Sequence, residues 1–208
     1  MDTPKWVYSE QVKEHFMDPH NVLEGKPDDF DHDGKGIAGS MQCGDEMLFL
    51  IKVDKAQEII TDCRWKTFGC ASAIASASKL SDMVKGMQLE EAYQINANDI
   101  IVELGGLPDK KVHCSVLGDK ALRAAIKNYY QRIGEPEKIP EDYNRLICEC
   151  KNVTEKDIED VVLDNIRDFR KLQEETGLGT VCGQCIDEAK QIMQDYIGHY
   201  FESRKQKD

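Results

Sequence analysis

Eight cysteines are spread over this chain of 208 residues, and their spacing constrains the fold more than any other feature. One set is a C-x-C motif followed by a C-x-x-C motif: Cys148, Cys150, Cys182 and Cys185. The other set is widely separated: Cys43, Cys70 and Cys114. Four closely spaced thiolates are typical of a closed metal site, whereas three separated ones cannot complete a four-coordinate site alone. The sequence therefore predicts one complete metal site and one incomplete site that is suited to exchange or chemistry.

The chain carries a formal net charge of −12 at pH 7. This charge argues against nucleic acid and anionic membranes as partners, because both require a basic surface. No apolar stretch approaches the roughly 18 residues of a transmembrane helix. Residues 1–6 show no basic segment followed by an apolar run, so we expect no secretory signal and a cytoplasmic location. Thiols stay reduced in that compartment, and paired cysteines then indicate metal or redox sites before disulfides.

The hydrophobic pattern predicts an α+β domain over residues 1–132, with a small antiparallel sheet and packed helices. We expect two strands joined by a hairpin turn, at residues 47–53 and 59–68. One face of the second strand is predicted to carry Ile59, Thr61, Cys63 and Trp65. The Asp- and Gly-rich residues 28–39 are predicted to be a loop. The expected helices are residues 8–16, 71–86, 89–95, 100–104 and 115–130.

Residues 133–146 contain glycine and two prolines among charged residues, and they are the predicted linker. Residues 147–208 are predicted to form a small all-helical domain that ends in a polar tail. Its expected helices are residues 154–163, 166–175 and 182–200. The apolar core of this domain is small, so a metal site would supply the staple that a domain of this size needs.

The four-cysteine set lies where two segments of this second domain begin to form helices. Gly183 allows the backbone to bend around an ion, and a helix N-terminus stabilises thiolates. Four thiolates fit either a tetrahedral Zn²⁺ or a [2Fe–2S] cluster, and the spacing alone does not choose between them. The structural alternative is four buried thiols, which this spacing disfavours in a reducing compartment.

In the three-cysteine set, Cys70 and Cys114 lie at predicted helix N-termini, where thiolate character is raised. Asp45 follows Cys43 by two residues and His113 directly precedes Cys114, so these two residues are candidates for a fourth ligand. Each residue also has an ordinary structural explanation. A single cysteine more often packs as a small hydrophobe, an aspartate after glycine more often caps a turn, and a histidine more often makes a structural hydrogen bond.

Cys63 belongs to neither set. Its place within an alternating strand indicates a packing residue. The alternative is an auxiliary thiol close to Cys70.

These residues, in this order, resemble the NifU-type iron–sulfur cluster assembly scaffold. The N-terminal part is similar to the IscU family in four segments: Tyr8-Ser9-Glu10 with His15-Phe16 and Pro19, Cys43-Gly44-Asp45, residues 66–76 (KTFGCASAIAS) and residues 107–115 (LPDKKVHCS). The C-terminal part resembles the [2Fe–2S] module of NifU, which is related to bacterioferritin-associated ferredoxin, at its four cysteines. The resemblance covers residues 5–198.

The resemblance implies a scaffold, not an enzyme that turns over a substrate. Such a scaffold accepts sulfur as persulfide from a cysteine desulfurase together with ferrous iron. It assembles a transient [2Fe–2S] or [4Fe–4S] cluster and passes it to apo-proteins. The implied ligands of this cluster are Cys43, Asp45, Cys70 and Cys114, with His113 as an alternate ligand or a proton carrier. We expect Cys114 to accept the persulfide, and Asp45 to ease release as a hard oxygen ligand on a soft centre.

The same resemblance implies a permanent [2Fe–2S] cluster on the four C-terminal cysteines, which would supply electrons or serve only as a staple. Lys111 is expected to screen the thiolates or contact the desulfurase, and a solvated lysine is the alternative. A homodimer is implied. An Hsp70-type chaperone is a further implied partner, although the segment Leu-Pro-Pro-x-Lys that it recognises has Asp109 in place of its second proline.

Two other functions remain open at this stage. An electron-transfer ferredoxin would use the N-terminal part only for docking, and a zinc protein would hold structural ions in both halves in place of clusters. A thiol oxidoreductase is disfavoured, because no βαβ pattern surrounds the C-x-x-C motif.

Overall fold

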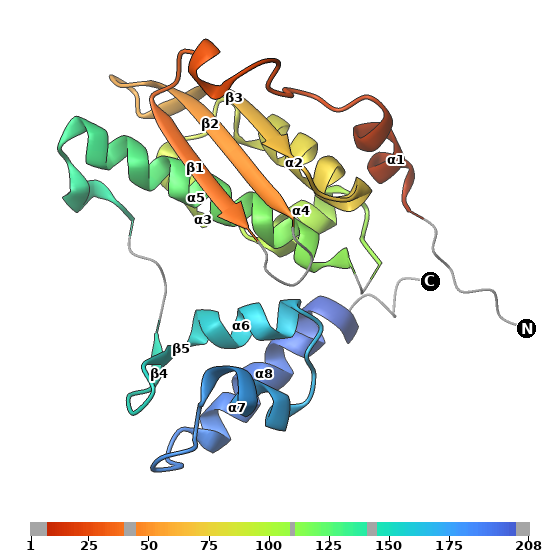
Figure 1. The fold of residues 1–208 in the computed structure, drawn as a ribbon, viewed down its shortest axis with the longest axis vertical. Helices are drawn as coiled ribbons and strands as arrows, with labels where there is room; N and C mark the ends of the chain where they lie inside the picture. The colour runs from red at the N-terminus through yellow and green to blue at the C-terminus, as the bar shows by residue number, and fades with distance from the viewer. Residues whose placement is uncertain (1–7, 40–44, 109–110, 141–144, 203–208) are drawn as a thin grey trace, which may run out of the picture. The chain divides into compact units, whose positions relative to one another are not determined.

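The computed structural model describes residues 8–39, 45–108, 111–140 and 145–202, with only the backbone at 113–116 and 202. The chain divides into two compact units, Met1–Pro140 (unit 1) and Glu141–Asp208 (unit 2), and each is described by itself. Unit 1 holds an antiparallel sheet covered by helices, and unit 2 holds helices and a short hairpin (Figure 1). The α+β prediction is therefore confirmed.

The sheet of unit 1 has three strands in the order β1 (Gly34–Gly39), β2 (Glu46–Asp54) and β3 (Ile59–Thr67). The predicted hairpin of β2 and β3 is confirmed, with Met47 opposite Thr67. The prediction of a loop over residues 28–39 is wrong in its second half, where β1 pairs with β2. The sequence of β1, GKGIAG, has three glycines and only one of the branched or aromatic residues by which a strand is usually recognised, Ile37.

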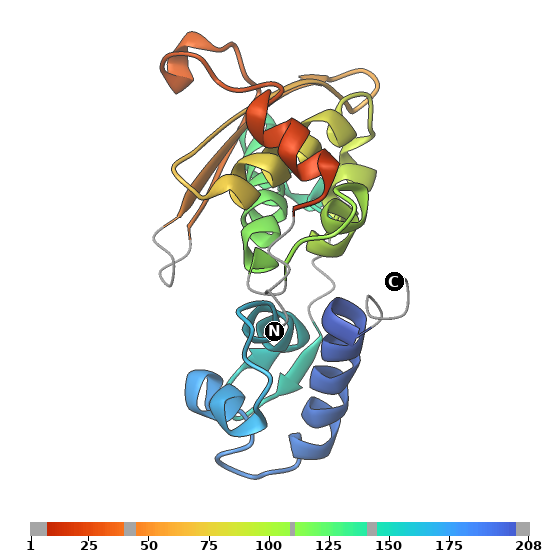
Figure 2. The same cartoon turned by 90° about the vertical axis from the view of Figure 1, so that its right-hand side faces the viewer.

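The glycines of β1 allow a helix to pack directly against the sheet. The long helix α5 (His113–Ile133) crosses this face. Figure 1 shows it behind the strands, and the turned view of Figure 2 shows the sheet and the helix side by side. A Cβ atom added to Gly34 would overlap the Ala125 carbonyl, and one added to Gly36 would overlap the backbone of Ala121. The absence of side chains at these two positions therefore sets the distance between α5 and β1.

Strand β2 is buried on both faces, which explains its continuous apolar run from Met47 to Ile51. On the face away from α5, Leu48 and Leu50 pack with Leu23, and Phe30 closes the cluster. The segment before β1, which includes the short 3₁₀ helix η1 (Pro27–Asp29), therefore covers the second face of the sheet.

A β-bulge changes the predicted face of β3. The register between β2 and β3 shifts after Lys52, so that Thr61 has no partner and Val53 pairs with Ile60. Ile60, Cys63 and Trp65 are consequently buried, whereas Thr61 is exposed. The predicted face is right at Cys63 and Trp65 and wrong at Ile59 and Thr61.

The other helices of unit 1 agree with the predicted ones to within two residues, except that α4 begins three residues earlier than predicted. They are α1 (Glu10–Met17), α2 (Ala71–Val84), α3 (Leu89–Gln94) and α4 (Ala97–Glu103), followed by the 3₁₀ turn η3 (Pro136–Lys138). Helix α2 contacts α1, α5 and β3. Its small side chains are buried accordingly: Ser72, Ala73, Ala75, Ser76, Ala77, Ser78 and Ser81. A helix made of small residues fits where neighbours approach from several sides.

Unit 2 is helical apart from a short hairpin that the sequence analysis did not predict. The hairpin strands are β4 (Leu146–Cys148) and β5 (Val153–Thr154), and they are too short to show an alternating pattern. The helices are α6 (Glu155–Leu163), α7 (Phe169–Thr176) and α8 (Ile186–Ile197), with a π-helical turn at Gly198–Glu202.

Two helix starts in unit 2 bear on the predictions. Thr154 and Asp157 cap α6 reciprocally in a capping box, so this helix begins within one residue of the predicted start. Helix α8 begins four residues later than predicted, at Ile186. The turn before it contains Gly183 in a left-handed conformation (φ 74°), which interrupts a helix that would otherwise start at Cys182.

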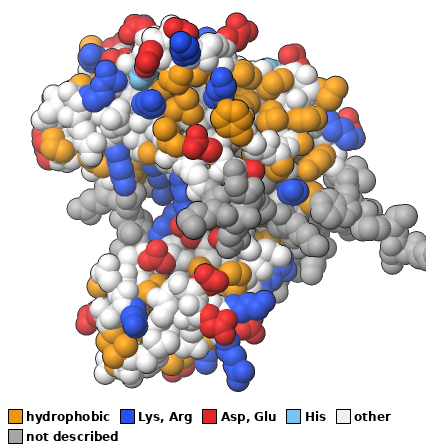
Figure 3. Space-filling view, in the orientation of Figure 1, with side chains coloured by type: hydrophobic (Ala, Val, Ile, Leu, Met, Phe, Trp, Pro, Cys, Tyr) orange, Lys and Arg blue, Asp and Glu red, His pale blue; other side chains and the backbone are white. Residues whose placement is uncertain are grey.

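The surface of unit 1 is mixed in character. Exposed hydrophobic side chains lie among charged ones on the face shown in Figure 3. The large exposed hydrophobic residues of unit 1 include Met17, Ile37, Phe68 and Val102. Across the described residues, every helix is too short or too polar to traverse a bilayer.

The contact between β1 and α5 generates a prediction about stability. We expect Gly36→Ala to lower the free energy of unfolding of unit 1 by about 1–3 kcal/mol, because the new methyl group meets helix backbone that cannot move aside. Gly39→Ala is the matched control. Its nearest atom would be the Asp45 carbonyl oxygen at 3.7 Å, an ordinary contact that costs less than about 0.5 kcal/mol.

Denaturation followed by tryptophan fluorescence measures this difference. Both tryptophans, Trp6 and Trp65, belong to unit 1, so the signal reports on that unit. Equal stability of the two variants would contradict the account of β1.

Candidate functional site

The four C-terminal cysteines converge in unit 2. Cys148 ends β4, Cys150 follows in the hairpin turn, and Cys182 and Cys185 flank the turn before α8. The Sγ atoms of Cys150 and Cys182 are 3.5 Å apart, and the side chains of Cys148 and Cys185 are hydrogen-bonded to each other. Cys148 and Cys185 are buried, whereas Cys150 and Cys182 are exposed. The four sulfurs therefore form a group with one buried and one exposed side.

Backbone N–H groups point at this group of sulfurs. The N–H of Gly179 lowers the pKa of Cys148, helped by the N–H groups of Lys151 and Cys150. Burial raises the pKa of Cys185, and the hydrogen bond with Cys182 raises that of Cys150. Opposite pKa shifts are expected of neighbouring thiols, because the first thiolate to form makes ionisation of its neighbours less favourable. Here Cys148 is the thiol that ionises most easily.

Gly179 is required for this arrangement. Its φ of 73° is left-handed, and a Cβ atom there would lie 2.6 Å from Ile186 Cγ1. A side chain would thus push the loop away from α8 and withdraw the N–H from Cys148.

The donor set of unit 2 fits a metal centre. Four thiolate sulfurs are the usual ligands of structural zinc and of [2Fe–2S] clusters. N–H groups directed at the sulfurs are a means by which proteins tune the reduction potential of such clusters. When bound, a [2Fe–2S] cluster supplies one-electron transfer.

In unit 1 the structure places Asp45 beside the turn that carries Cys70. Cys70 is the N-cap residue of α2, and Asp45 directly precedes β2. A Cβ atom built on Gly69, the neighbour of Cys70, would lie 3.0 Å from Asp45 Oδ2. Gly69 is held in place because its N–H donates to Thr67 Oγ1 at 3.0 Å. Asp45 and the turn that carries Cys70 therefore lie side by side at one end of the sheet.

The start of α5 belongs to the same end of unit 1. Strand β1 and helix α5 run in opposite directions, because Gly34 meets Ala125 and the later residue Gly36 meets the earlier residue Ala121. From Ala121 back to the second residue of α5 is about 10 Å along the helix, and from Gly36 to the end of β1 is also about 10 Å. The first turn of α5 is therefore level with the end of β1 and with the beginning of β2.

Three predicted site residues are not fully described. Cys43 lies outside the described residues, and only the backbone of His113 and Cys114 is described, as the first two residues of α5. Their ligand roles therefore stay predictions. Lys111 lies just before α5, half-buried, and its N–H donates to the Pro108 carbonyl at 2.7 Å.

Cys63 is placed away from these residues. It is fully buried opposite Ile51 on the face of the sheet that α5 covers, and burial strongly raises the pKa of its thiol. A neutral buried thiol agrees with the predicted packing role.

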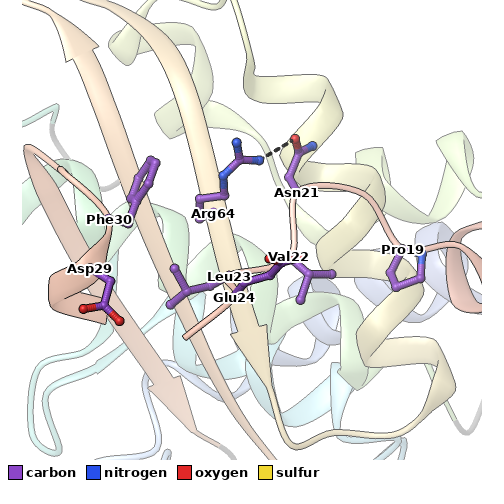
Figure 4. Close-up of a pocket in the computed structure, with 8 residues that line it drawn as sticks. All are labelled: Pro19, Asn21, Val22, Leu23, Glu24, Asp29, Phe30 and Arg64. Atoms are coloured by element: carbon purple, nitrogen blue, oxygen red, sulfur yellow. Dashed lines mark hydrogen bonds between the residues drawn. The ribbon is translucent and has the colours of Figure 1, made fainter. Parts of the chain in front are cut away.

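Unit 1 also contains an open depression of about 460 Å³ (Figure 4). It is lined by the segment from Pro19 to Phe30 and by Arg64, whose guanidinium donates to Asn21 Oδ1 at 3.2 Å and pairs with Asp62 at 3.0 Å. None of the predicted ligands lines this depression, and its arginine already has partners. It is not the candidate site.

The sequence analysis missed one group of metal-donor side chains, formed by His15, His20 and Asp82. Burial lowers the pKa of His15, and a hydrogen bond to Asp82 raises that of His20. These residues come from α1, the following loop and the end of α2, and no sequence spacing links them. Only the packing of α1 on α2 places them together.

Comparison with known proteins matches both units. A family described as the NifU-like N-terminal domain matches residues 7–136, and a BFD-like [2Fe–2S] binding domain matches residues 146–195. The nitrogen fixation protein NifU of Nostoc sp. is 39% identical over 193 residues, which cover 91% of this chain and 64% of that protein. The NifU of Azotobacter chroococcum is 37% identical over 195 residues, which cover 60% of that protein. This chain thus spans about 60–64% of the length of these NifU relatives.

Unit 1 also matches shorter relatives. The iron–sulfur cluster assembly scaffold protein IscU of Aquifex aeolicus is 47% identical over 141 residues, which cover 65% of this chain and 86% of that protein. Among solved structures, a cluster assembly scaffold protein for the SUF system from Fervidobacterium islandicum has 22% identity. Its TM-score is 0.45, over 60% of this chain and 100% of that one.

The geometry of unit 2 predicts a difference between two buried cysteines. We expect Cys185→Ala to abolish the iron that the chain retains through gel filtration with a chelator, and to lower the thermal stability of unit 2, because the metal site staples that unit. Cys63→Ala is the matched control, since it also removes a buried thiol. It should keep this iron and destabilise unit 1 by about 1 kcal/mol.

Iron analysis and calorimetry distinguish the two variants. Retention of chelator-resistant iron by Cys185→Ala would contradict the assignment of the four cysteines.

Proposed function

This chain belongs to the family of NifU-like N-terminal domains, and from that premise we propose that it is a scaffold on which iron–sulfur clusters are assembled before transfer to apo-proteins. The observation that carries the proposal is the proximity of the Asp45 carboxylate to the turn of Cys70, at the end of unit 1 where α5 begins. The printed names of the relatives, NifU and IscU, support the same function.

The cargo cluster is proposed to bind Cys43, Asp45, Cys70 and Cys114. Three thiolates supply soft ligands, and the carboxylate supplies one hard oxygen that binds iron in such a centre less firmly. A scaffold must hold its cluster long enough to build it and then release it, so a weaker ligand at one position suits this role. His113, the first residue of α5, is the proposed alternate ligand or proton carrier.

Cys114 is the proposed sulfur acceptor. It is the second residue of α5, where the helix N-terminus favours a thiolate. The thiolate would attack the terminal sulfur of a persulfide on the cysteine desulfurase. A new S–S bond then forms at Cys114, the old S–S bond breaks, and the desulfurase cysteine leaves as a thiolate. Conversion of each such sulfur to sulfide takes two electrons from a reductant.

Unit 2 is proposed to keep its [2Fe–2S] cluster permanently. All four of its ligands are thiolates, and buried Cys148 and Cys185 anchor the inner side. Zinc in place of the cluster is the alternative occupant. The chain as a whole is proposed to act as a scaffold in the cytoplasm and not as an enzyme, with residues 133–146 linking residues 1–132 to residues 147–208.

The cysteine desulfurase and apo iron–sulfur proteins are the proposed partners. Phe68, 78% exposed and two residues before Cys70, offers an apolar contact to either of them beside the cargo site. Lys111 is proposed to screen the thiolates or contact the desulfurase. A homodimer and an Hsp70-type chaperone complete the proposed assembly.

The oxygen ligand gives the sharpest test of this function. We expect Asp45→Ala to release the cluster of unit 1 to a chelator several-fold more slowly than the parent chain, because the mismatched ligand that promotes release is gone. Asp28→Ala, which removes an exposed aspartate from η1, should release it at the parental rate. Visible absorption after anaerobic reconstitution gives both rates. Equal or faster release from Asp45→Ala would refute the role of this carboxylate.

A further inference from the structure

A third group of metal-donor side chains lies in unit 1, apart from both cysteine sets. His15 belongs to α1, His20 lies in the loop that follows, and Asp82 lies near the end of α2. One imidazole nitrogen of each histidine and one carboxylate oxygen all lie within 4.8 Å of one another. In the part of the chain that the structure describes, this is the one set of three or more His, Cys, Asp or Glu residues whose ligand atoms all lie within that distance.

Neighbouring residues orient the two histidines of this group. His15 is 7% exposed, and its Nδ1 is 2.8 Å from Ser78 Oγ. The same hydroxyl oxygen accepts the backbone N–H of His20 at 2.9 Å. The carbonyl of His20 in turn accepts the indole N–H of Trp65 at 2.8 Å. Ser78 therefore fixes the ring of one histidine and the backbone of the other.

The carboxylate is held in a similar way. Asp82 Oδ2 lies 2.5 Å from His20 Nδ1, and Asp82 Oδ1 accepts the side-chain N–H of Asn21 at 2.8 Å. The rings of His15 and His20 meet edge to face, with centroids 5.0 Å apart. Hydrogen bonds to groups outside the ligand set hold metal ligands in place in proteins. The side chains of His15 and Asp82 each have one, to Ser78 and Asn21, and His20 is held through its backbone.

We propose that His15, His20 and Asp82 form a binding site for a divalent transition-metal ion. Two imidazoles and one carboxylate are a ligand set that suits Zn²⁺ and Fe²⁺, with water in the remaining positions. Two ligands about 2.1 Å from an ion and at right angles lie about 3 Å apart. The side chains of His20 and Asp82 are 42% and 37% exposed, and their 2.5 Å contact can widen to this distance.

An ion at His20 Nδ1 takes the position of the hydrogen in the contact between this nitrogen and Asp82 Oδ2. An imidazolium ring releases that proton to solvent, whereas a neutral ring carries its hydrogen on Nε2 instead, with no net release. A bound ion would also link α1 to α2, because it would be coordinated by His15 of α1 and by Asp82 of α2.

The site is separate from the proposed cargo site. Asp82 is twelve residues beyond Cys70 on α2, a distance of about 18 Å along the helix. The proposal therefore does not depend on cluster assembly, and it holds or fails independently of the function argued above.

Titration of the reduced full-length chain with ¹¹³Cd²⁺ tests the site, because the cadmium chemical shift separates nitrogen and oxygen ligands from thiolates. We expect one resonance in the nitrogen–oxygen region in addition to the thiolate resonances. His20→Ala and Asp82→Asn change exposed side chains and should each abolish that resonance while the thiolate resonances persist. His32→Ala is the matched control, since the His32 ring hydrogen-bonds to the Phe30 carbonyl and His32 is not one of the three proposed ligands. It should leave every resonance in place.

Ring ¹⁵N spectra of the histidines give a second measurement on the unmodified chain. The signals of His15 and His20 should shift with Cd²⁺, and that of His32 should not. Absence of the nitrogen–oxygen resonance from the parent chain, or its persistence in both His20→Ala and Asp82→Asn, would overturn the proposal.

Discussion

The packing of α5 on the glycines of β1 is the contact on which the arrangement of unit 1 depends. Gly34 and Gly36 leave no Cβ atoms between the strand and the helix, so backbone meets backbone there. Because β1 and α5 run in opposite directions, this contact places the start of α5 at the end of the sheet where β2 begins and β3 finishes. Asp45, the turn of Cys70 and the first turn of α5 are brought to one place by it.

Much of this fold could be predicted from sequence, and the failures have identifiable causes. The apolar run from Met47 to Ile51 predicts a buried strand, and the small residues of α2 predict a tightly packed helix. Strand β1 was missed because the glycines that its helix contact requires are also typical of loops. The bulge at Thr61 and the hairpin before Thr154 depend on pairing between strands, which local composition does not reveal.

The residues of the candidate sites also divide into those that the sequence predicts and those that it does not. The four cysteines of unit 2 were predictable because their spacing is short and their chemistry uncommon. The position of Asp45 beside Gly69 was not, because it arises from strand register and from the hydrogen bonds of Thr67. The group around His20 had no sequence signal at all, since helix packing alone assembles it. Ligand sets made of closely spaced cysteine pairs are visible in a sequence, whereas those made of single residues assembled across the fold need coordinates.

We propose that the chain holds two kinds of cluster, one that it transfers to acceptors and one that it retains. The direct measurement mixes the reconstituted chain with an excess of an apo iron–sulfur acceptor and follows both partners over time. Visible circular dichroism reports cluster on the acceptor, and the EPR signal of the reduced chain reports the cluster of unit 2. The account predicts that the acceptor fills while the EPR signal of unit 2 stays constant. Loss of the unit 2 signal in step with acceptor loading, or no loading at all, would contradict it.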